Sequence, residues 1–305
     1  MNTPVAKIIS GQSLYRWRQW AIAQAQANDI DIEEVDWVLQ SATALSSLSL
    51  RLDLYRSEFE LPIQISLADL TAKWQQRITN RVPVQYLIGE TPWRNFSLHV
   101  SPAVLIPRPE TELIIDIAQK LVAQNPIAAK QHVGDWADLG TGSGAIALAL
   151  ADCFAASTIH AVDISKAALE IASHNAKKYH LDRRITFYQG DWFSPLSPLK
   201  GKLSGIVSNP PYIPSQTISM LQPEVAHHEP HTALDGGDDG LDCIKILIAE
   251  GAAYLQSGGI WLIELMNGQA ERVASLLSQN KNYTHITTHL DLAGIDRFVS
   301  ARKAL

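Results

Sequence analysis

Apolar residues recur at helical spacing along the first 80 residues of the chain. Three segments carry this pattern: Leu14, Trp17, Ala21 and Ala25; Val35, Val38, Leu39 and Ala42; and Leu67, Leu70, Trp74 and Ile78. Ser66, followed three residues later by Asp69, is typical of a capped helix start. We therefore expect a small helical bundle over residues 1–80. Its tryptophans fit a core better than a binding surface: Trp17, Trp20, Trp37 and Trp74.

Residues 81–107 have a different texture, with short runs rich in β-branched and aromatic residues. Val84–Ile88 and Phe96–Val100 have strand character, and residues 89–92, with a glycine and a proline, have turn chemistry. We therefore predict a β-hairpin that links two domains.

From residue 108 to the end of the chain, short apolar strands alternate with helical segments. This alternation is typical of βαβ units in an α/β domain with a doubly wound, mostly parallel sheet. The expected strands are 136–139, 158–162, 185–188, 206–208 and 260–264, and the expected helices lie near 144–154, 166–179, 241–256 and 268–280. Two final strands, 283–288 and 297–301, are expected around a turn at Gly294.

Composition narrows the functional classes. With 305 residues, 46% hydrophobic and 18% charged, the chain is expected to fold throughout, and a length of roughly 150 residues per domain favours two domains. A net charge of −6 argues against unspecific binding to nucleic acid backbones. Cys153 and Cys243 lack metal-site or disulfide spacing. No apolar stretch approaches the ~20 residues that span a membrane, so we expect a cytoplasmic protein, and a monomer.

A glycine-rich loop follows the first strand of the predicted sheet and opens a helix. Its residues, Gly140, Thr141, Gly142, Ser143 and Gly144, allow a tight turn and a close approach of the backbone to a ligand. Such a loop predicts a nucleotide-type cofactor. The glycines alone also fit the dinucleotide pattern, so they do not distinguish S-adenosylmethionine from NAD.

Acidic and aromatic residues end the next two strands. Asp163 lies where a carboxylate can accept hydrogen bonds from ribose hydroxyls, and Asp191 with Trp192 offers an acceptor and a flat ring to an adenine. Because parallel strands end at the same edge of a sheet, we expect all three beside the glycine loop. We therefore predict that they bind the cofactor, together with Asn209.

The fourth strand ends in Asn209-Pro210-Pro211-Tyr212, which is the most informative tetrapeptide of the chain. The prolines stiffen the loop, and the Asn209 side chain and the Pro210 carbonyl are adjacent acceptors that suit a planar NH2 group. The ring of Tyr212 can cover the plane of that group. We predict that Asn209, Pro210 and Tyr212 are catalytic, that Pro211 also contacts the substrate, and that the reaction methylates an amide or amine nitrogen by positioning it.

Further motifs give the chain a strong resemblance to the release factor glutamine methyltransferases, which methylate the glutamine of the Gly-Gly-Gln loop in class I peptide chain release factors. The resemblance covers nearly the whole chain. Its carriers are Arg81–Gly89, Leu105–Glu112, the glycine loop, Ser208–Ile213, Glu229-Pro230 and Ala233–Gly237.

This resemblance implies a Rossmann-like class I methyltransferase domain over residues 108–305. It implies S-adenosylmethionine at the glycine loop, Asp163 and Trp192, and the substrate glutamine at residues 209–212. It also implies that the N-terminal domain helps to dock the release factor. Glu110 and Glu112 are equally well explained as the first-turn acids of a helix, so we leave them outside the predicted site.

Other functions stay open from the sequence. The substrate could be a ribosomal protein glutamine, or the exocyclic amine of a flipped nucleobase. A nicotinamide-dependent dehydrogenase, or a nucleotide-binding module without catalysis, would leave residues 209–212 unexplained. A metal site at His227, His228 and His231 is not expected, because no second ligand cluster lies near them in the sequence.

Overall fold

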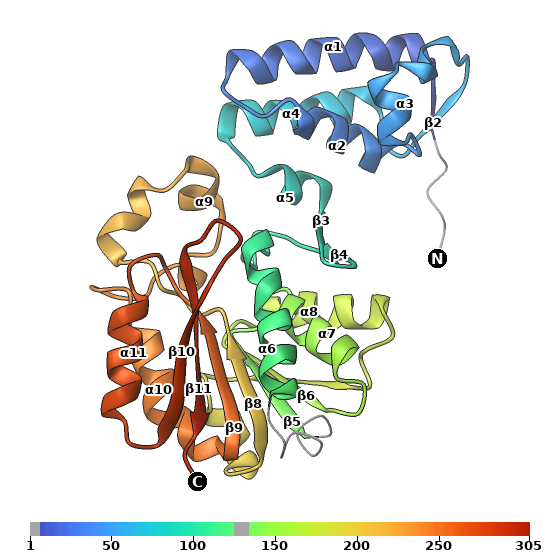
Figure 1. Ribbon diagram of the computed structural model, residues 1–305. Coiled ribbons are helices and arrows are strands. Elements are labelled where there is room, and N and C mark those ends of the chain that lie inside the picture. The colour runs from blue at the N-terminus through green and yellow to red at the C-terminus, as the bar shows by residue number, and fades with distance from the viewer. Residues whose placement is uncertain (1–6, 125–133) are drawn as a thin grey trace. The chain divides into compact units, whose positions relative to one another are not determined.

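The computed structural model describes residues 7–124 and 134–305 (Figure 1). It contains two compact units that meet in the chain at Gly89 and Glu90. Within the described residues, no helix is both long and apolar enough to span a membrane.

The N-terminal unit is helical, as the apolar spacing predicts. Its helices are α1 (Gly11–Ala27), α2 (Glu33–Ala42), α3 (Ser47–Arg51), α4 (Leu67–Asn80) and α5 (Val84–Ile88), with a 3-10 turn η1 (Leu54–Ser57). A short antiparallel pair, β1 (Lys7–Ile9) with β2 (Leu61–Ile63), was not predicted. Ser66 and Asp69 form the predicted capping box at the start of α4.

The core of this unit contains the residues whose periodicity predicted the helices. Leu14, Val35, Leu39 and Leu70 are all buried. Trp17 and Trp74 are also buried and pack edge to face, with ring centroids 6.5 Å apart, so they are core residues as predicted. Trp20 and Trp37 pack against the same core but are only partly buried.

The predicted hairpin exists, but its first strand was placed wrongly. Residues 84–88 form helix α5, which starts after Pro83 and ends at Gly89, whose φ of +84° is left-handed. The hairpin instead pairs β3 (Glu90–Trp93) with β4 (Phe96–His99). Residues 90–92, predicted as a turn, therefore belong to a strand, and the hairpin forms part of the second unit.

The second unit contains a mostly parallel sheet, as predicted. In the described residues it has seven strands in the order β10-β11-β9-β8-β5-β6-β7. These are β5 (Asp135–Leu139), β6 (Ile159–Asp163), β7 (Ile185–Gln189), β8 (Leu203–Ser208), β9 (Leu255–Glu264), β10 (Tyr283–Leu290) and β11 (Asp296–Lys303). Among these described strands, β11 alone runs antiparallel to both of its neighbours.

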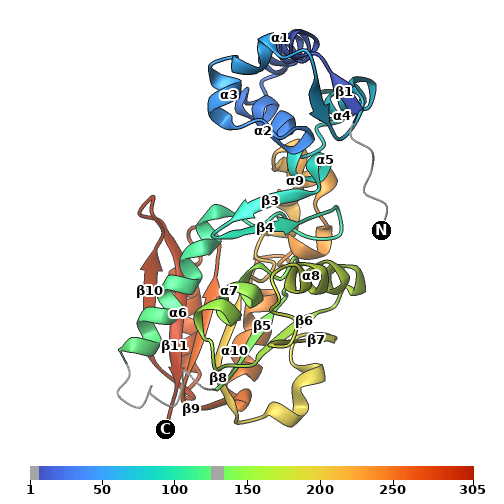
Figure 2. The same cartoon turned by 90° about the vertical axis from the view of Figure 1, so that its right-hand side faces the viewer.

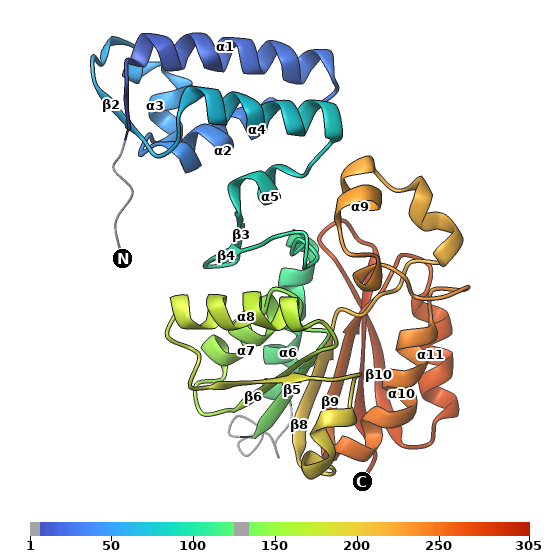
Figure 3. The same ribbon diagram turned by 180° about the vertical axis from the view of Figure 1, so that it is seen from behind.

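Helices cover both faces of this sheet, as a doubly wound topology requires (Figures 2 and 3). Helices α6 (Leu113–Ala123), α7 (Ala145–Cys153) and α8 (Lys166–Lys178) pack on one face. On the other face lie α10 (Asp242–Tyr254) and α11 (Ala270–Gln279). Each face of the sheet has its own hydrophobic core. Along β5 the side chains alternate between them: Trp136 packs in the core under α6, α7 and α8, and Ala137 and Leu139 pack in the core under α10 and α11.

The strand order fixes where a ligand can bind. The connection from β5 leads to β6 on one side, whereas β8 lies on the other side of β5, so the sheet reverses its winding between β5 and β8. The helices that follow neighbouring strands diverge at such a point and leave a crevice at the carboxyl ends of the strands. The glycine loop after β5 and Asn209 after β8 both lie at this edge.

Candidate active site

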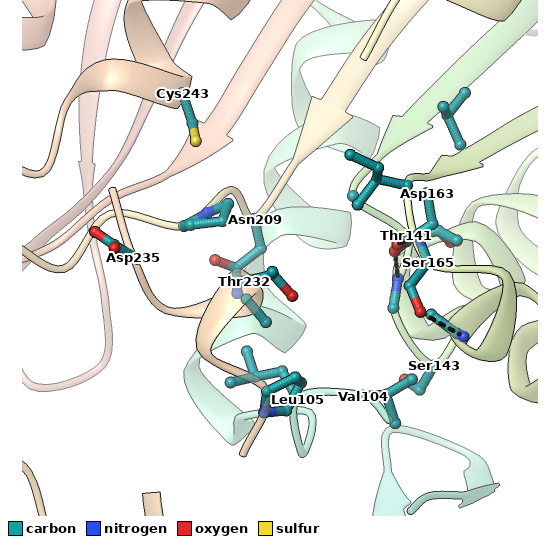
Figure 4. A pocket seen from close by; sticks show the side chains of 18 of the residues that line it. Val104, Leu105, Thr141, Ser143, Asp163, Ser165, Asn209, Thr232, Asp235 and Cys243 are labelled. Carbon is teal, nitrogen blue, oxygen red and sulfur yellow. Dashed lines mark hydrogen bonds between the residues drawn. The ribbon is translucent and has the colours of Figure 1, made fainter. Parts of the chain in front are cut away.

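A cavity of about 530 Å³ opens at the carboxyl edge of the sheet. Cofactor pockets commonly enclose about 300 to 1,000 Å³. Figure 4 shows Asp163 and Ser165 on one side of this cavity, and Asn209 and Thr232 across from them. Most of the predicted site residues line it: Gly140, Thr141, Gly142, Ser143, Asp163, Asp191, Trp192, Asn209 and Pro211.

The glycine loop has the backbone that its sequence predicts. Gly140, Gly142 and Gly144 have φ values of +75°, +54° and +84°, which are left-handed and favour glycine. A Cβ atom on Gly142 would lie in open space, whereas a Cβ on Gly144 would lie 2.9 Å from Leu148 Cδ1. Gly142 therefore leaves room beside the cavity, and Gly144, which does not line it, permits α7 to pack closely on α8.

The buried Asp138 side chain holds this loop in place through hydrogen bonds. Its Oδ2 accepts a hydrogen bond of 2.6 Å from the Thr141 hydroxyl and one of 3.0 Å from the Ala147 amide at the start of α7. The side chain is fully buried, and burial raises its pKa to about 7. Asp138 thus holds the loop through its side chain without reaching the cavity.

Asp163 ends β6 and orders the turn that follows. Its two carboxylate oxygens accept from the amides of Gly142 and Ser165, each at 2.8 Å. Burial raises its pKa, although these hydrogen bonds oppose the shift. Each oxygen keeps further acceptor capacity, so the carboxylate can still receive ligand hydroxyl groups.

Asp191 and Trp192 line the cavity after β7. Trp192 is half-buried with a left-handed φ of +42°, and a Cβ on Gly140 would lie 3.6 Å from its ring. The ring therefore lies against the glycine loop. Asp191 is exposed, and its carboxylate is free of hydrogen bonds to the described residues.

The tetrapeptide after β8 is only partly at the cavity. Asn209 and Pro211 line it, whereas Pro210 is buried and neither Pro210 nor Tyr212 is among its lining residues. The Tyr212 hydroxyl donates to Glu264 Oε1 at 3.1 Å, and burial, followed by the negative charge of Glu264, raises the pKa of this tyrosine. The contacts of Pro210 and Tyr212 with a substrate therefore stay predictions.

A glycine-rich segment packs directly on this tetrapeptide. This segment runs from residue 234 to residue 240. The Ile213 amide donates to the Leu234 carbonyl at 3.0 Å, and the Gly236 amide donates to the Ile213 carbonyl at 2.9 Å. A Cβ on Gly236 would lie 2.8 Å from the Tyr212 Cα, and a Cβ on Gly240 would lie 2.3 Å from the Tyr212 carbonyl oxygen. Only glycine permits this close approach, which explains the two glycines at these positions.

Three polar residues at or near the site lie outside the predicted set: Arg108, Thr111 and Glu264. Arg108 lines the cavity, and its Nη2 lies 2.7 Å from Glu229 Oε2. Thr111 also lines the cavity and accepts a hydrogen bond from Asn209. Both residues belong to the motif at residues 105–112, which carries the family resemblance and whose acids, Glu110 and Glu112, are also explained by a helix start. The buried Glu264 had a signal too, because it is an acid at the carboxyl end of an apolar strand.

Solved structures share this fold. The hMettl16 catalytic domain in complex with a MAT2A 3'UTR hairpin has a TM-score of 0.54 at 13% identity, covering 77% of this chain and 80% of its own. The T. thermophilus 16S rRNA N2 G1207 methyltransferase, solved with AdoMet and guanosine, has a TM-score of 0.50 at 18% identity, covering 70% and 49%. At these identities the likeness establishes the fold alone.

Sequence relatives are much closer. Residues 111–228 match the family model of the methyltransferase small domain. A release factor glutamine methyltransferase of Synechocystis sp. is 48% identical, covering 96% of this chain and 97% of the relative. Another, from Thermosynechococcus vestitus, is 44% identical over 96% of this chain and 99% of its own length. The chain therefore belongs to the family of release factor glutamine methyltransferases.

Proposed function

We propose that this protein transfers a methyl group from S-adenosylmethionine to the side-chain amide nitrogen (N5) of the glutamine in the Gly-Gly-Gln loop of class I release factors. The observation that carries the proposal is that Asn209 and the glycine loop line one cavity. A cofactor site and an amide acceptor therefore lie together. Membership of the family adds the identity of the protein substrate.

The residues at the cavity fit the proposed cofactor. Gly142 leaves open space where a side chain would stand, Asp163 offers a carboxylate to ribose hydroxyls, and the Trp192 ring offers a flat apolar face. Asp191 would accept from an adenine amine. When bound, S-adenosylmethionine supplies an electrophilic methyl group on a positively charged sulfur.

The protein's part in the reaction is positioning. A carboxamide nitrogen is a poor nucleophile because its lone pair is delocalised, as it is in the peptide bond. The Asn209 side-chain oxygen and the Pro210 carbonyl would accept one N–H each and turn the nitrogen toward the methyl group. Holding the reacting atoms about 3 to 3.5 Å apart yields a large rate advantage. The nitrogen lone pair would form the new N–C bond as the bond between sulfur and the methyl carbon breaks, which leaves the cofactor as a neutral thioether. The methylated nitrogen would then lose a proton to water or to one of the two acceptors.

We further propose that the N-terminal helical unit helps to dock the release factor. The family relatives that are named for this substrate match the chain over nearly its full length, and so include this unit. We also propose that the protein is a monomer and that it acts in the cytoplasm, where release factors work.

Mass spectrometry of a release factor incubated with the protein and S-adenosylmethionine tests the function. We expect a single added methyl group on the Gly-Gly-Gln glutamine. We expect no methylation of a release factor in which that glutamine is replaced by glutamate, which lacks the nitrogen. Asn209→Ala should abolish transfer while the melting temperature stays near that of the wild type.

Two other results would contradict the proposal. Methyl transfer to a ribosomal protein glutamine in place of the release factor would change the substrate. Transfer to RNA or DNA would indicate that Asn209 holds a nucleobase amine. Labelled methyl transfer to each class of substrate under the same conditions distinguishes these cases.

A further inference from the structure

A series of buried, hydrogen-bonded side chains lies behind the Asn209 side chain. Asn209 Nδ2 donates to the Thr111 hydroxyl oxygen at 3.1 Å, and Thr111 is only 4% exposed. Thr111 belongs to the 3-10 turn η2 (Pro109–Glu112), so it reaches Asn209 from a segment 98 residues away in the chain. Among the described residues, Asn209 Oδ1 makes no hydrogen bond and remains free to accept one.

Thr111 in turn has a proton to place. Its oxygen accepts from Asn209, so the hydroxyl hydrogen needs an acceptor of its own. Glu264 ends β9 with 1% of its surface exposed, and its carboxyl group lies within hydrogen-bonding reach of the Thr111 hydroxyl. Glu264 Oε1 receives the Tyr212 hydroxyl, and Oε2 has no partner with standard hydrogen-bond geometry among the described residues. Burial raises the pKa of Glu264, and hydrogen bonding from Thr111 opposes that shift, so the Thr111 donor has its acceptor in Glu264.

The chemistry of these side chains sets which group donates and which accepts in each hydrogen bond. While Glu264 is ionised, its carboxylate can only accept hydrogen bonds, so the Thr111 hydroxyl donates to Glu264 and its oxygen accepts from Asn209. Asn209 must then present its NH2 group to Thr111. Its oxygen is left for the substrate.

The direction matters because the two ends of an asparagine amide have nearly the same shape. A glutamine carboxamide must present its nitrogen to the methyl group, and that nitrogen carries two N–H donors. An Asn209 turned the other way would set NH2 against NH2, which leaves the substrate donors without an acceptor. Such an unmet buried donor is strongly unfavourable.

We propose that Thr111 and Glu264 are positioning residues that fix the Asn209 side chain with its oxygen toward the substrate amide. The proposal rests on the proposed function, because it requires a substrate with an NH2 group. Glu264 does not line the cavity, and Thr111 holds the Asn209 side chain directly. Both act through Asn209.

Three variants test this arrangement. Thr111→Val keeps the shape and removes the hydroxyl, and we expect kcat to fall 10- to 100-fold with little change in cofactor affinity. Thr111→Ser restores the hydroxyl and should recover kcat to within threefold of the wild type. Glu264→Gln places an NH2 donor opposite Thr111. Thr111 can then accept a hydrogen bond from this group and donate its own hydroxyl hydrogen to Asn209. We expect kcat to fall at least tenfold in this variant.

Thr91→Val is the matched control, since Thr91 is also 4% exposed but lies in β3, away from the cavity. It should change stability as much as Thr111→Val does while kcat stays near wild type. The proposal is overturned if Thr111→Val keeps wild-type kcat, or if Thr111→Ser is as slow as Thr111→Val.

A second measurement separates this proposal from the function. In NMR spectra of the protein without substrate, the Asn209 side-chain NH2 signals, assigned by their loss in Asn209→Asp, should report one hydrogen-bonded N–H. That signature should vanish in Thr111→Val and persist in Thr111→Ser. If the wild type methylates no release factor but shows this pattern, the function is wrong and the orientation holds. If the wild type is active and the pattern is absent, the orientation is wrong.

Discussion

Arg108 and Glu229 form an ion pair of 2.7 Å between the start of η2 and the residue that follows α9 (Pro223–His228). The Glu229 side chain is 1% exposed and that of Arg108 is 32% exposed. Arg108 lines the cavity, and residues 230–237 of the chain after Glu229 contribute several lining residues. The pair therefore ties two walls of the site together.

Removing Arg108 should destabilise the protein more than removing both partners. Arg108→Met leaves a buried carboxylate without its cation, and we expect a loss of about 1 to 3 kcal/mol, below the range for a fully buried pair because Arg108 is partly exposed. Burial already raises the Glu229 pKa, and Arg108 opposes that shift. The loss should shrink as the pH falls, because protonated Glu229 is neutral.

Urea unfolding at pH 5 and pH 8 measures this effect. The double variant Arg108→Met with Glu229→Gln is the control and should recover part of the stability at pH 8. Equal losses for Arg108→Met at both pH values would show that the charge of Glu229 is not the cause.

Gly142 and Gly144 should respond differently to alanine, although both have left-handed backbones. Each substitution carries roughly 1 to 2 kcal/mol of backbone strain. Gly144→Ala adds a clash with Leu148 and with Ala172, whose Cβ would lie 3.0 Å away, so it should cost a further 1 to 3 kcal/mol or so. A Cβ on Gly142 meets nothing within 4 Å in the protein, so its added methyl group should instead weaken cofactor binding.

Thermal unfolding and calorimetry with S-adenosylmethionine distinguish the two variants. Gly144→Ala should show the larger loss of stability, and Gly142→Ala the larger loss of affinity relative to its loss of stability. If Gly142→Ala binds the cofactor as the wild type does, the cofactor does not approach the loop at Gly142.

Asp163→Asn should weaken cofactor binding about 10- to 100-fold. Both carboxylate oxygens receive backbone N–H groups, and an amide can offer only one oxygen to them. One of the Gly142 and Ser165 amides therefore loses its acceptor, and a ribose acceptor is also lost. Isothermal calorimetry measures the effect.

Asp191→Asn is the matched control for this substitution. Asp191 is exposed, and an amide oxygen can still accept from an adenine amine, so we expect less than a threefold change. Equal effects of the two substitutions would contradict the separate roles assigned to Asp163 and Asp191.

The second unit could be predicted from sequence because its signals are long and redundant. Apolar strands alternate with helices over about 200 residues, and each expected strand after residue 135 overlaps an observed one. The first strand of the hairpin failed for a physical reason. The run Val84–Ile88 is too short for its periodicity to distinguish a strand from a helical turn, and Pro83 with Gly89 limits it to one short helix.

Only part of the site could be predicted, because some of its chemistry lies in local motifs and the rest lies in contacts between distant segments. Loop residues such as Gly142 and Asn209 carry their chemistry in local motifs. The partner relationships of Thr111 and Glu264 do not, because they join η2 to the end of β9 across 153 positions in the chain, and only the folded sheet brings them together. A buried acid at a strand end signals a polar partner, but the sequence does not say which one.

Asp138 should give the protein a measurable pH dependence of stability. Its pKa is about 7 in the folded protein and 3.8 for an ordinary aspartate, since burial favours the neutral form. The folded state therefore keeps this proton to a higher pH than the unfolded state does. The contribution of Asp138 is most favourable below about pH 4 and declines as the pH rises to about 7, by about 4 kcal/mol in total.

Asp138→Asn tests this directly, because an amide does not ionise. Its oxygen can still accept from Thr141 and Ala147, while its NH2 group takes the place of Oδ1, which has no partner among the described residues. Relative to the wild type, the variant should gain stability steadily in urea unfolding from pH 5 to pH 7 and level off by pH 8. Subtracting the two curves removes the contributions of Asp163, Glu229 and Glu264, which are present in both proteins. A constant difference between the curves would mean that Asp138 is ionised throughout this range, held so by Thr141 and the start of α7.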